Sequence, residues 1–198
     1  LFLENRYYAF KGLNLTLETL DGLIKHNGPI KNLKKFKEIL GVNYFKNKIN
    51  FSESPSLEAQ VASISDDIAY NSHDLEDGLN AKLFYLDDLF NIPVLNKIIS
   101  KHKTKLKYHS IDIVTRQIIR EIINEMVNDL IITTKNNIKK YKLYNLNDVY
   151  KTKYKIVKFS TKMENFDKKI KNFLKRKMYN NKNVKINTLK GKTIIRKL

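Results

Sequence analysis

Five side chains that could bind a metal ion or a sugar hydroxyl lie close together between residues 66 and 77. Asp66, Tyr70 and Asp74 recur every four residues, with His73 and Asp77 beside them. In an α-helix, this spacing places side chains on one face. Carboxylates bind hard divalent cations, and a phenol with a carboxylate can hydrogen-bond a sugar hydroxyl. The pattern therefore predicts one wall of an active site.

An acidic helix face is ordinarily just a solvated surface, and Tyr70 alone could be a packed helix aromatic. Two features favour the functional interpretation. The face lacks the Lys or Arg partners that a surface usually carries, and it lies on a chain of formal charge +18. Carboxylates held this close usually need a cation.

The elements that position this face can be inferred from the flanking residues. Ser54 is suited to cap a helix, Pro55 fits its first position, and a buried stripe is expected from Leu57, Val61, Ile64 and Ile68. With only six Gly and three Pro among 198 residues, the sequence predicts an all-α fold. Further helices are expected at 16–25, 79–90, 111–134 and from 160 onward, with a loop at 41–54 and a loop or short hairpin at 141–157.

Several longer motifs resemble the bacterial dGTPase-like group of deoxynucleoside triphosphate triphosphohydrolases, in the HD superfamily. The segment Ser56–Ala62 followed by Asp66–Leu79 is similar to the run SLEAQVA…D[DE]IAYNxHDxxDGL of that family. The other similar segments are Arg6–Thr16, Leu20–Pro29, Phe159–Met163 and Phe173–Tyr179. The resemblance covers nearly the whole chain and implies a helical HD-domain-like bundle.

The resemblance also implies roles for single residues. Asp66 matches the last metal ligand of the HD site, and Tyr70 and Asp74 match positions that contact the sugar and phosphates of a nucleotide. The implied reaction is attack of water on the α-phosphate of a dNTP, with release of deoxynucleoside and intact triphosphate. The implied cofactor is a divalent metal, and oxygen and imidazole ligands allow Mg, Mn, Fe or Zn.

His73-Asp74 is not interpreted as the metal-binding His-Asp pair of the superfamily, which occurs in a different motif that this chain lacks. The other histidines, His26, His102 and His109, have no metal-ligand spacing to one another and are expected to be surface or capping residues. Only one of the four expected metal ligands is therefore present.

The first residue is Leu1, and the chain opens within a family motif. We expect it to be the C-terminal part of a longer protein and inactive alone, with an N-terminal half or a homo-oligomer as partner. The alternative is a noncatalytic remnant or a basic module that oligomerises or binds nucleic acid.

Charge divides the chain into two expected regions. Residues 136–198 contain twenty Lys or Arg and three Asp or Glu, which is +17 of the total +18. We therefore expect residues 1–135 to be the end of the catalytic domain and residues 136–198 to be a basic helical region packed on it. The basic region could attract nucleic acid nonspecifically.

Two arginines are further candidates for a site. Arg116 and Arg120 lie four residues apart and could contact phosphates, or could form helix-surface ion pairs with Asp112 and Glu121. The absence of Cys excludes thiol catalysis and disulfides, and no run is long and apolar enough to span a membrane. A cytoplasmic location is the expectation that fits these features.

Overall fold

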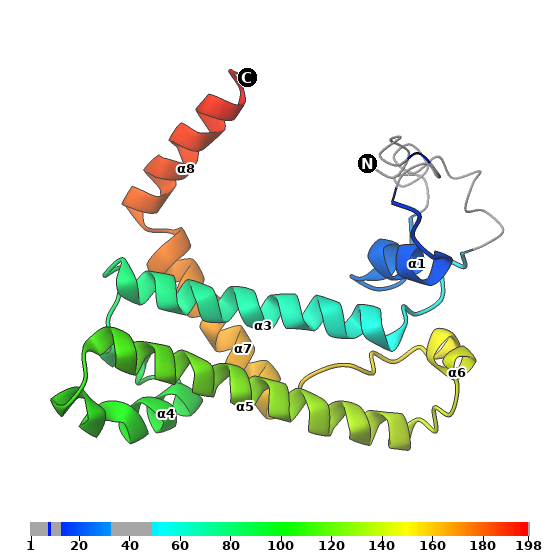
Figure 1. Ribbon diagram of the computed structural model, residues 1–198, viewed down its shortest axis with the longest axis horizontal. Coiled ribbons are helices and arrows are strands. Elements are labelled where there is room, and N and C mark those ends of the chain that lie inside the picture. Colours follow the sequence, from blue (N-terminus) through cyan, green and yellow to red (C-terminus); the bar gives the residue numbers. More distant parts are fainter. Residues whose placement is uncertain (1–7, 9–12, 33–48, 198) are drawn as a thin grey trace. The chain divides into compact units, whose positions relative to one another are not determined.

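The computed structural model describes residues 8, 13–32 and 49–197, and within these ranges the fold is all-α, without strands. Most of the expected segment Arg6–Thr16 and of the expected loop at 41–54 lies outside the described residues. Figure 1 shows the helices in chain order. They are α1 (Leu17–Lys25), α3 (Leu57–Asn80), α4 (Pro93–Lys103), α5 (Ile111–Lys140), α6 (Leu146–Lys151), α7 (Thr161–Leu174) and α8 (Lys182–Ile195).

The chain divides into two compact units. The first contains residues 1–65 and 135–157, and the second contains residues 66–134 and 158–198. Helices α3 and α5 each contribute to both units. The expected division into 1–135 and 136–198 rests on charge and resemblance, which these units do not test, so it stays a prediction.

The second unit has an apolar core to which α3, α4, α5 and α7 all contribute. Phe84 and Phe173 meet edge to face, with ring centroids 4.8 Å apart. A Cβ on Gly78 would lie 2.2 Å from the Phe84 ring, so only glycine fits at this point of α3. Other core residues of this unit are Ile68, Leu75, Leu95, Ile98, Ile118, Ile122, Met126, Phe166 and Ile170.

Buried polar side chains hold the first unit together. The Gln60 side-chain oxygen accepts hydrogen bonds from the amides of Ile156 and Val157, both at 3.1 Å. The Asn137 side chain donates to the Ile156 carbonyl at 2.8 Å. These bonds satisfy the backbone of a buried, extended segment that has no neighbouring strand to pair with among the described residues.

A buried lysine joins α1 to its surroundings in the same unit. Lys25 is 2% exposed and pairs with Asp21 at 2.7 Å. Its ammonium also donates to the carbonyls of Asn50 and Ser54, and lies 5.4 Å from the centroid of the Tyr150 ring. Burial, followed by the charge of Asp21, raises the pKa of the Tyr150 phenol.

The predicted helices at 16–25 and from 160 onward are confirmed, because Thr16 caps α1 and Ser160 caps α7 with their side chains. The predicted start of α3 is wrong by two residues. Ser56 accepts the amide of Ala59, whereas the Ser54 hydroxyl donates to the Thr152 carbonyl at 2.7 Å. Val61 is 45% exposed, so the predicted buried stripe of α3 holds for Ile64 and Ile68 only.

Three other predictions need correction. The helix expected at 79–90 is wrong, because α3 ends at Asn80 and only a short 3₁₀ turn, Leu86–Leu89, follows. The hairpin suggested for 141–157 is wrong as well, because helix α6 occupies its middle, capped by Asn145. The predicted central helix is six residues longer than expected, since α5 continues to Lys140.

Candidate functional site

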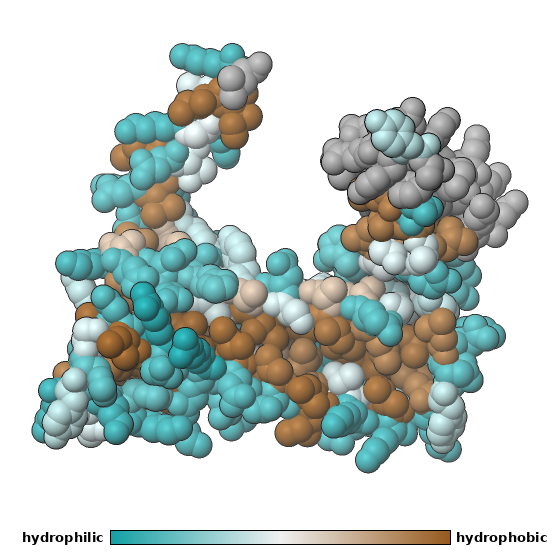
Figure 2. Space-filling model, in the orientation of Figure 1, coloured by the Kyte–Doolittle hydropathy of each residue, from teal (hydrophilic) through white to brown (hydrophobic). Residues whose placement is uncertain are grey.

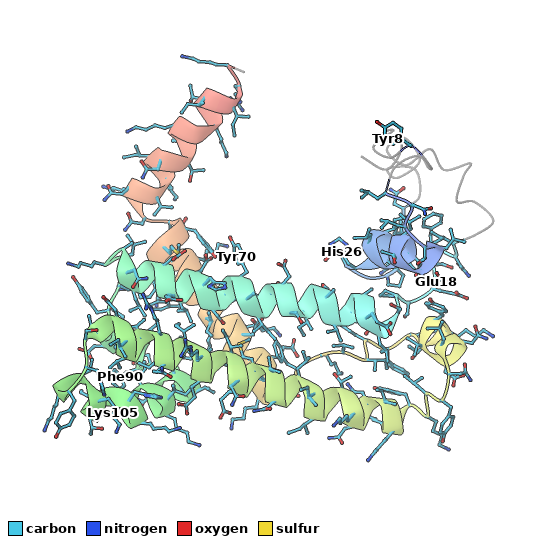
Figure 3. The ribbon with its side chains drawn as sticks, in the orientation of Figure 1. Tyr8, Glu18, His26, Tyr70, Phe90 and Lys105 are labelled. Carbon is cyan, nitrogen blue, oxygen red and sulfur yellow. The ribbon has the colours of Figure 1, made fainter. Side chains whose placement is uncertain are left out.

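The residues predicted to form the wall of a site lie along the second-unit part of α3. Asp66, Tyr70, His73 and Asp77 are exposed, with Tyr70 at 59%, and Asp74 is half-buried. Figure 3 shows Tyr70 projecting from α3 and not packed into the core. The alternative in which Tyr70 is a packed helix aromatic is therefore wrong.

Tyr179 joins this face from a distant part of the sequence. Its hydroxyl donates a hydrogen bond to the Asp74 carboxylate, across a separation of 105 residues. The Tyr179 hydroxyl also hydrogen-bonds Tyr70. Burial, followed by the hydrogen bonds with Asp74 and Tyr70, raises the pKa of Tyr179 well above that of an ordinary phenol. Two phenols and a carboxylate thus form one cluster.

A turn of π-helix positions Tyr179. Helix α7 passes at Lys175 into the π-helical segment Lys175–Tyr179, and the Asn180 amide donates to the Lys175 carbonyl at 3.1 Å. Such turns interrupt the regular α-helical register and are frequent at functional sites. From the sequence, Tyr179 is recognised only as part of the motif Phe173–Tyr179. It lies 105 residues from Asp74 along the chain, so the sequence gives no sign that the two side chains are in contact.

The π-helical segment that carries Tyr179 is also bound to the 3₁₀ turn at Leu86–Leu89. Lys177, within the π-helical segment, donates to Asp88 at 3.0 Å. Asp88 also accepts the Tyr85 amide at 2.9 Å. This backbone hydrogen bond, followed by the bond from Lys177, lowers the pKa of Asp88. The bonds fix the segment that carries Tyr179 against the 3₁₀ turn at Leu86–Leu89.

Asp66 differs from its neighbour Asp67. Asp67 lies 3.4 Å from the Lys171 ammonium, which also pairs with Asp167 at 2.9 Å. Burial alone would lower the pKa of Lys171, but the hydrogen bond and charge of Asp167 raise it. Asp167 in turn accepts a hydrogen bond from Asn71 at 2.8 Å. Asp66 has no such partner among the described residues, so its carboxylate is open to an external ligand.

The described residues do not form a metal site by themselves. Within them, no group of three or more His, Cys, Asp or Glu side chains is placed to hold a metal ion. A divalent cation in a protein usually takes three or more protein ligands, or fewer with substrate phosphates. The donor set seen here therefore does not fit a metal, and a metal role for Asp66 needs ligands from elsewhere.

Arg116 and Arg120 lie on α5. The Nε atom of Arg116 is 3.9 Å from Glu76, and its side chain is 65% exposed. Glu76 projects about 160° around α3 from Asp74, so this pair lies on another side of the helix from the tyrosine cluster. Arg120 is exposed. The roles of both arginines as phosphate contacts stay predictions.

The alternative that pairs these arginines with Asp112 and Glu121 is wrong for Glu121. Its carboxylate is bound by Lys101 at 2.7 Å and by His102 at 2.6 Å. The hydrogen bond from Lys101, followed by that from His102, lowers the pKa of Glu121. His102 thus has a structural partner.

The remaining histidines match their expected surface or capping roles. His26 follows the last residue of α1, and its Nδ1 lies 2.8 Å from the Leu23 carbonyl. His109 is exposed. Within the described ranges, none of the helices is long and apolar enough to cross a bilayer.

Comparison with known proteins identifies proteins that are similar in sequence to this chain. No protein-family model matches it. A protein of Pelagibacter ubique named deoxyguanosinetriphosphate triphosphohydrolase-like protein is 52% identical over the whole chain, which covers 53% of that relative. Relatives of the same name from Rickettsia typhi and Rickettsia felis are 37% and 35% identical over 89% and 99% of the chain, which covers 46% and 51% of them. The chain thus spans about half the length of the curated relatives it matches, and over its whole length it is a homologue of the deoxyguanosinetriphosphate triphosphohydrolase-like proteins.

Proposed function

We propose that this chain supplies the nucleotide-binding wall of a metal-dependent dNTP triphosphohydrolase. The observation that carries the proposal is the cluster of Tyr70, Asp74 and Tyr179, which brings two hydroxyls and a carboxylate together at the surface of the second unit. Such groups can donate to and accept from a sugar hydroxyl. The names of the homologues support a triphosphohydrolase as the setting.

In this proposal, Tyr179 holds the Asp74 carboxylate in one orientation. Asp74 accepts a hydrogen bond from the sugar, and Tyr70, which is exposed, packs against the sugar or its phosphates. A carboxylate with a fixed partner loses less freedom when it binds a ligand than a free one does. In this proposal Tyr179 therefore positions the Asp74 carboxylate and also forms part of the nucleotide-binding wall.

The proposed role of Asp66 is to contribute one carboxylate to a divalent metal site. Mg, Mn, Fe and Zn all remain candidates for the metal, which would supply the polarising charge for phosphate hydrolysis. The other ligands must come from beyond the described residues, so the 198-residue chain alone is expected to have no turnover.

A surface on α5 supports the need for a further polypeptide. Ile113, Val127 and Ile131 are 48%, 36% and 46% exposed. They share, within about 60° of arc, one face of α5 with Arg116 and Arg120. Figure 2 shows hydrophobic side chains exposed along α5. We propose that the rest of the protein, or a second copy, covers this face.

The test uses a hybrid protein in which this chain replaces the matching part of the Pelagibacter ubique relative. Asp74→Asn and Tyr70→Phe should lower kcat/KM for dGTP by about ten- to a hundredfold, because a hydrogen bond to a charged group contributes about 1.5–3 kcal/mol. Asp67→Asn is the matched control, because Asp67 pairs with Lys171 instead. Unchanged kinetics in the Asp74 and Tyr70 variants would contradict the proposed wall.

The second candidate function is a noncatalytic module. It is favoured by the lack of any metal-holding group among the described residues. A hybrid that folds and binds divalent metal but hydrolyses no dNTP would support it. Turnover in the hybrid, together with none in the isolated chain, would support the first proposal.

A further inference from the structure

A buried hydrogen bond joins α3 to α7 where the two helices cross (Figure 1). The Asn71 side-chain amide donates to Asp167 Oδ1 at 2.8 Å, and Asp167 Oδ2 pairs with the Lys171 ammonium at 2.9 Å. Asn71 is 3% exposed and Asp167 is 8% exposed. We call Asn71 and Asp167 the amide–carboxylate pair. Both oxygens of its carboxylate are engaged.

The carboxylate of this pair lies in an otherwise apolar core. Among the described residues of the second unit, Asp167 is the only charged side chain that is buried. Its neighbours along α7, Phe166 and Ile170, are buried as well. An ionised carboxylate is costly to remove from water, and replacing a buried polar pair by apolar residues often leaves a protein equally stable. Stability alone therefore does not account for the pair.

A buried polar pair fixes the position of one helix on another more sharply than apolar packing does. Leucine, isoleucine and phenylalanine can repack against neighbours of similar size. A buried carboxylate that moves away from its donor stays unpaired, which is a large loss. Buried polar groups fix the register of packed helices in this way. The amide–carboxylate pair thus favours one placement of α7 on α3.

The same two helices carry the tyrosine cluster. Asn71 and Asp74 are three residues apart, so their side chains project about 60° from each other around α3. Helix α7 passes at Lys175 into the π-helical segment that ends at Tyr179, and the Tyr179 hydroxyl donates to Asp74. A rotation or shift of α7 on α3 would therefore move the Tyr179 hydroxyl away from Asp74.

From these contacts we propose that the amide–carboxylate pair positions the nucleotide-binding wall, because it fixes α7 on α3 and so holds the Tyr179 hydroxyl against Asp74. Asn71 and Asp167 are then positioning residues that act through Asp74. The inference rests on the proposed function of that wall. The ion pair between Asp67 and Lys171 is not part of the device, since it is 3.4 Å long and its side chains are 59% and 42% exposed.

The test replaces both members of the pair by leucine, whose side chain branches at the same carbon as those of Asn and Asp. The thermal midpoint of Asn71→Leu/Asp167→Leu should equal or exceed that of wild type, because no buried polar group is left without a partner. The midpoint of Asn71→Leu alone should fall, since Asp167 loses its amide donor. The double variant therefore separates positioning from stability.

The phenol of Tyr179 reports its contact with Asp74 in the 198-residue chain. Tyrosinate absorbance is followed as the pH rises, and the part due to Tyr179 is the difference between each protein and the same protein with Tyr179→Phe. In wild type this difference should be absent up to about pH 11.5, because burial and the hydrogen bond with Asp74 raise the pKa of Tyr179. In the double leucine variant it should appear at about pH 10, as for an ordinary phenol. Asp67→Asn is the matched control and should follow wild type.

An exchange of the two groups provides a second set of variants. Asn71→Asp alone brings two carboxylates together, so Tyr179 should ionise as an ordinary phenol. Adding Asp167→Asn again places an amide against a carboxylate and should restore the wild-type titration. Equal titrations in these two proteins would overturn the proposal. A folded double leucine variant in which Tyr179 stays protonated would overturn it too, and circular dichroism shows whether each variant is folded.

Kinetics of the hybrid protein test whether the pair acts through Asp74. The double leucine variant should lower kcat/KM for dGTP about tenfold, mainly through a higher KM, and in an Asp74→Asn background the leucines should cause no further loss. Losses that simply multiply would overturn the positioning role. Unchanged kcat/KM in Asp74→Asn itself would instead contradict the proposed wall, and the Tyr179 titration in the isolated chain would still decide the role of the pair.

Discussion

At the residue scale, the hydroxyl of Tyr179 joins Asp74 and Tyr70 of α3 into one hydrogen-bonded cluster. Asp66, Tyr70 and Asp74 could be placed on one face from their spacing alone, because four residues is close to one helical turn. Tyr179 could not, because it reaches Asp74 across 105 residues and through a π-helical turn. The local spacing of residues carries no information about a contact between distant segments or about a π-helical turn.

The environment of Tyr179 predicts a specific pH dependence. Because its pKa is raised in the folded protein, the unfolded chain loses the phenol proton first as the pH rises above about 10. The contribution of the protonated Tyr179 phenol to the free energy of unfolding is fully present below that pH and is lost as the pH rises above it. The difference in unfolding free energy between wild type and Tyr179→Phe should therefore shrink between pH 8 and pH 11.5, measured by urea denaturation.

Tyr108→Phe is the control for this titration, because Tyr108 is 79% exposed. Its unfolding free energy should follow the wild-type curve throughout. If Tyr179→Phe also runs parallel to wild type up to pH 11.5, Tyr179 is not held protonated by Asp74 and Tyr70.

A second residue-scale prediction concerns Gln60, whose side chain accepts two buried amides. Gln60→Leu should leave the amides of Ile156 and Val157 without an acceptor, at a cost of about 1–3 kcal/mol each. Hydrogen exchange of these two amides should accelerate and the thermal midpoint should fall. Gln117→Leu, at an exposed position of α5, is the control. Unchanged protection in Gln60→Leu would show that the amides have another acceptor.

At the element scale, helices with strong end signals were predictable and those defined by packing were not. Thr16 and Ser160 mark the starts of α1 and α7, as their side chains cap them. Helix α4 begins at Pro93, a residue that suits either the end of one helix or the start of another. Only tertiary burial of Leu95, Ile98 and Ile99 decides between them.

Gly78 allows the Phe84 ring to pack against α3. Gly78→Ala should destabilise the second unit by about 1–3 kcal/mol, since the added methyl would overlap the buried ring. Thermal unfolding measures the loss, and adding Phe84→Leu should recover part of it.

The control for Gly78 is Gly191 in α8, where a Cβ would have no neighbour within 4 Å. Gly191→Ala should be neutral, or stabilise α8 by up to about 1 kcal/mol through helix propensity. A Gly78→Ala protein as stable as Gly191→Ala would mean that Phe84 does not pack as described.

At the scale of the whole molecule, charge and contacts divide the chain differently. The basic residues after 136 predict one tail, whereas residues 135–157 fold with the first unit and residues 158–198 with the second. Composition reports where charge lies along the sequence and not which residues pack together, so the division between residues 135 and 136 stays a prediction. The all-α class was predictable, because it depends on overall Gly and Pro content and on repeated apolar spacing.

The proposed reaction needs more residues than those described here, because the described residues hold no complete metal site. The most direct measurement is ³¹P NMR of the products that the hybrid protein forms from dGTP. We expect intact triphosphate, with its formation abolished by Asp66→Ala and retained in Asp67→Ala. Release of pyrophosphate or orthophosphate by the hybrid, or full activity in Asp66→Ala, would contradict this expectation.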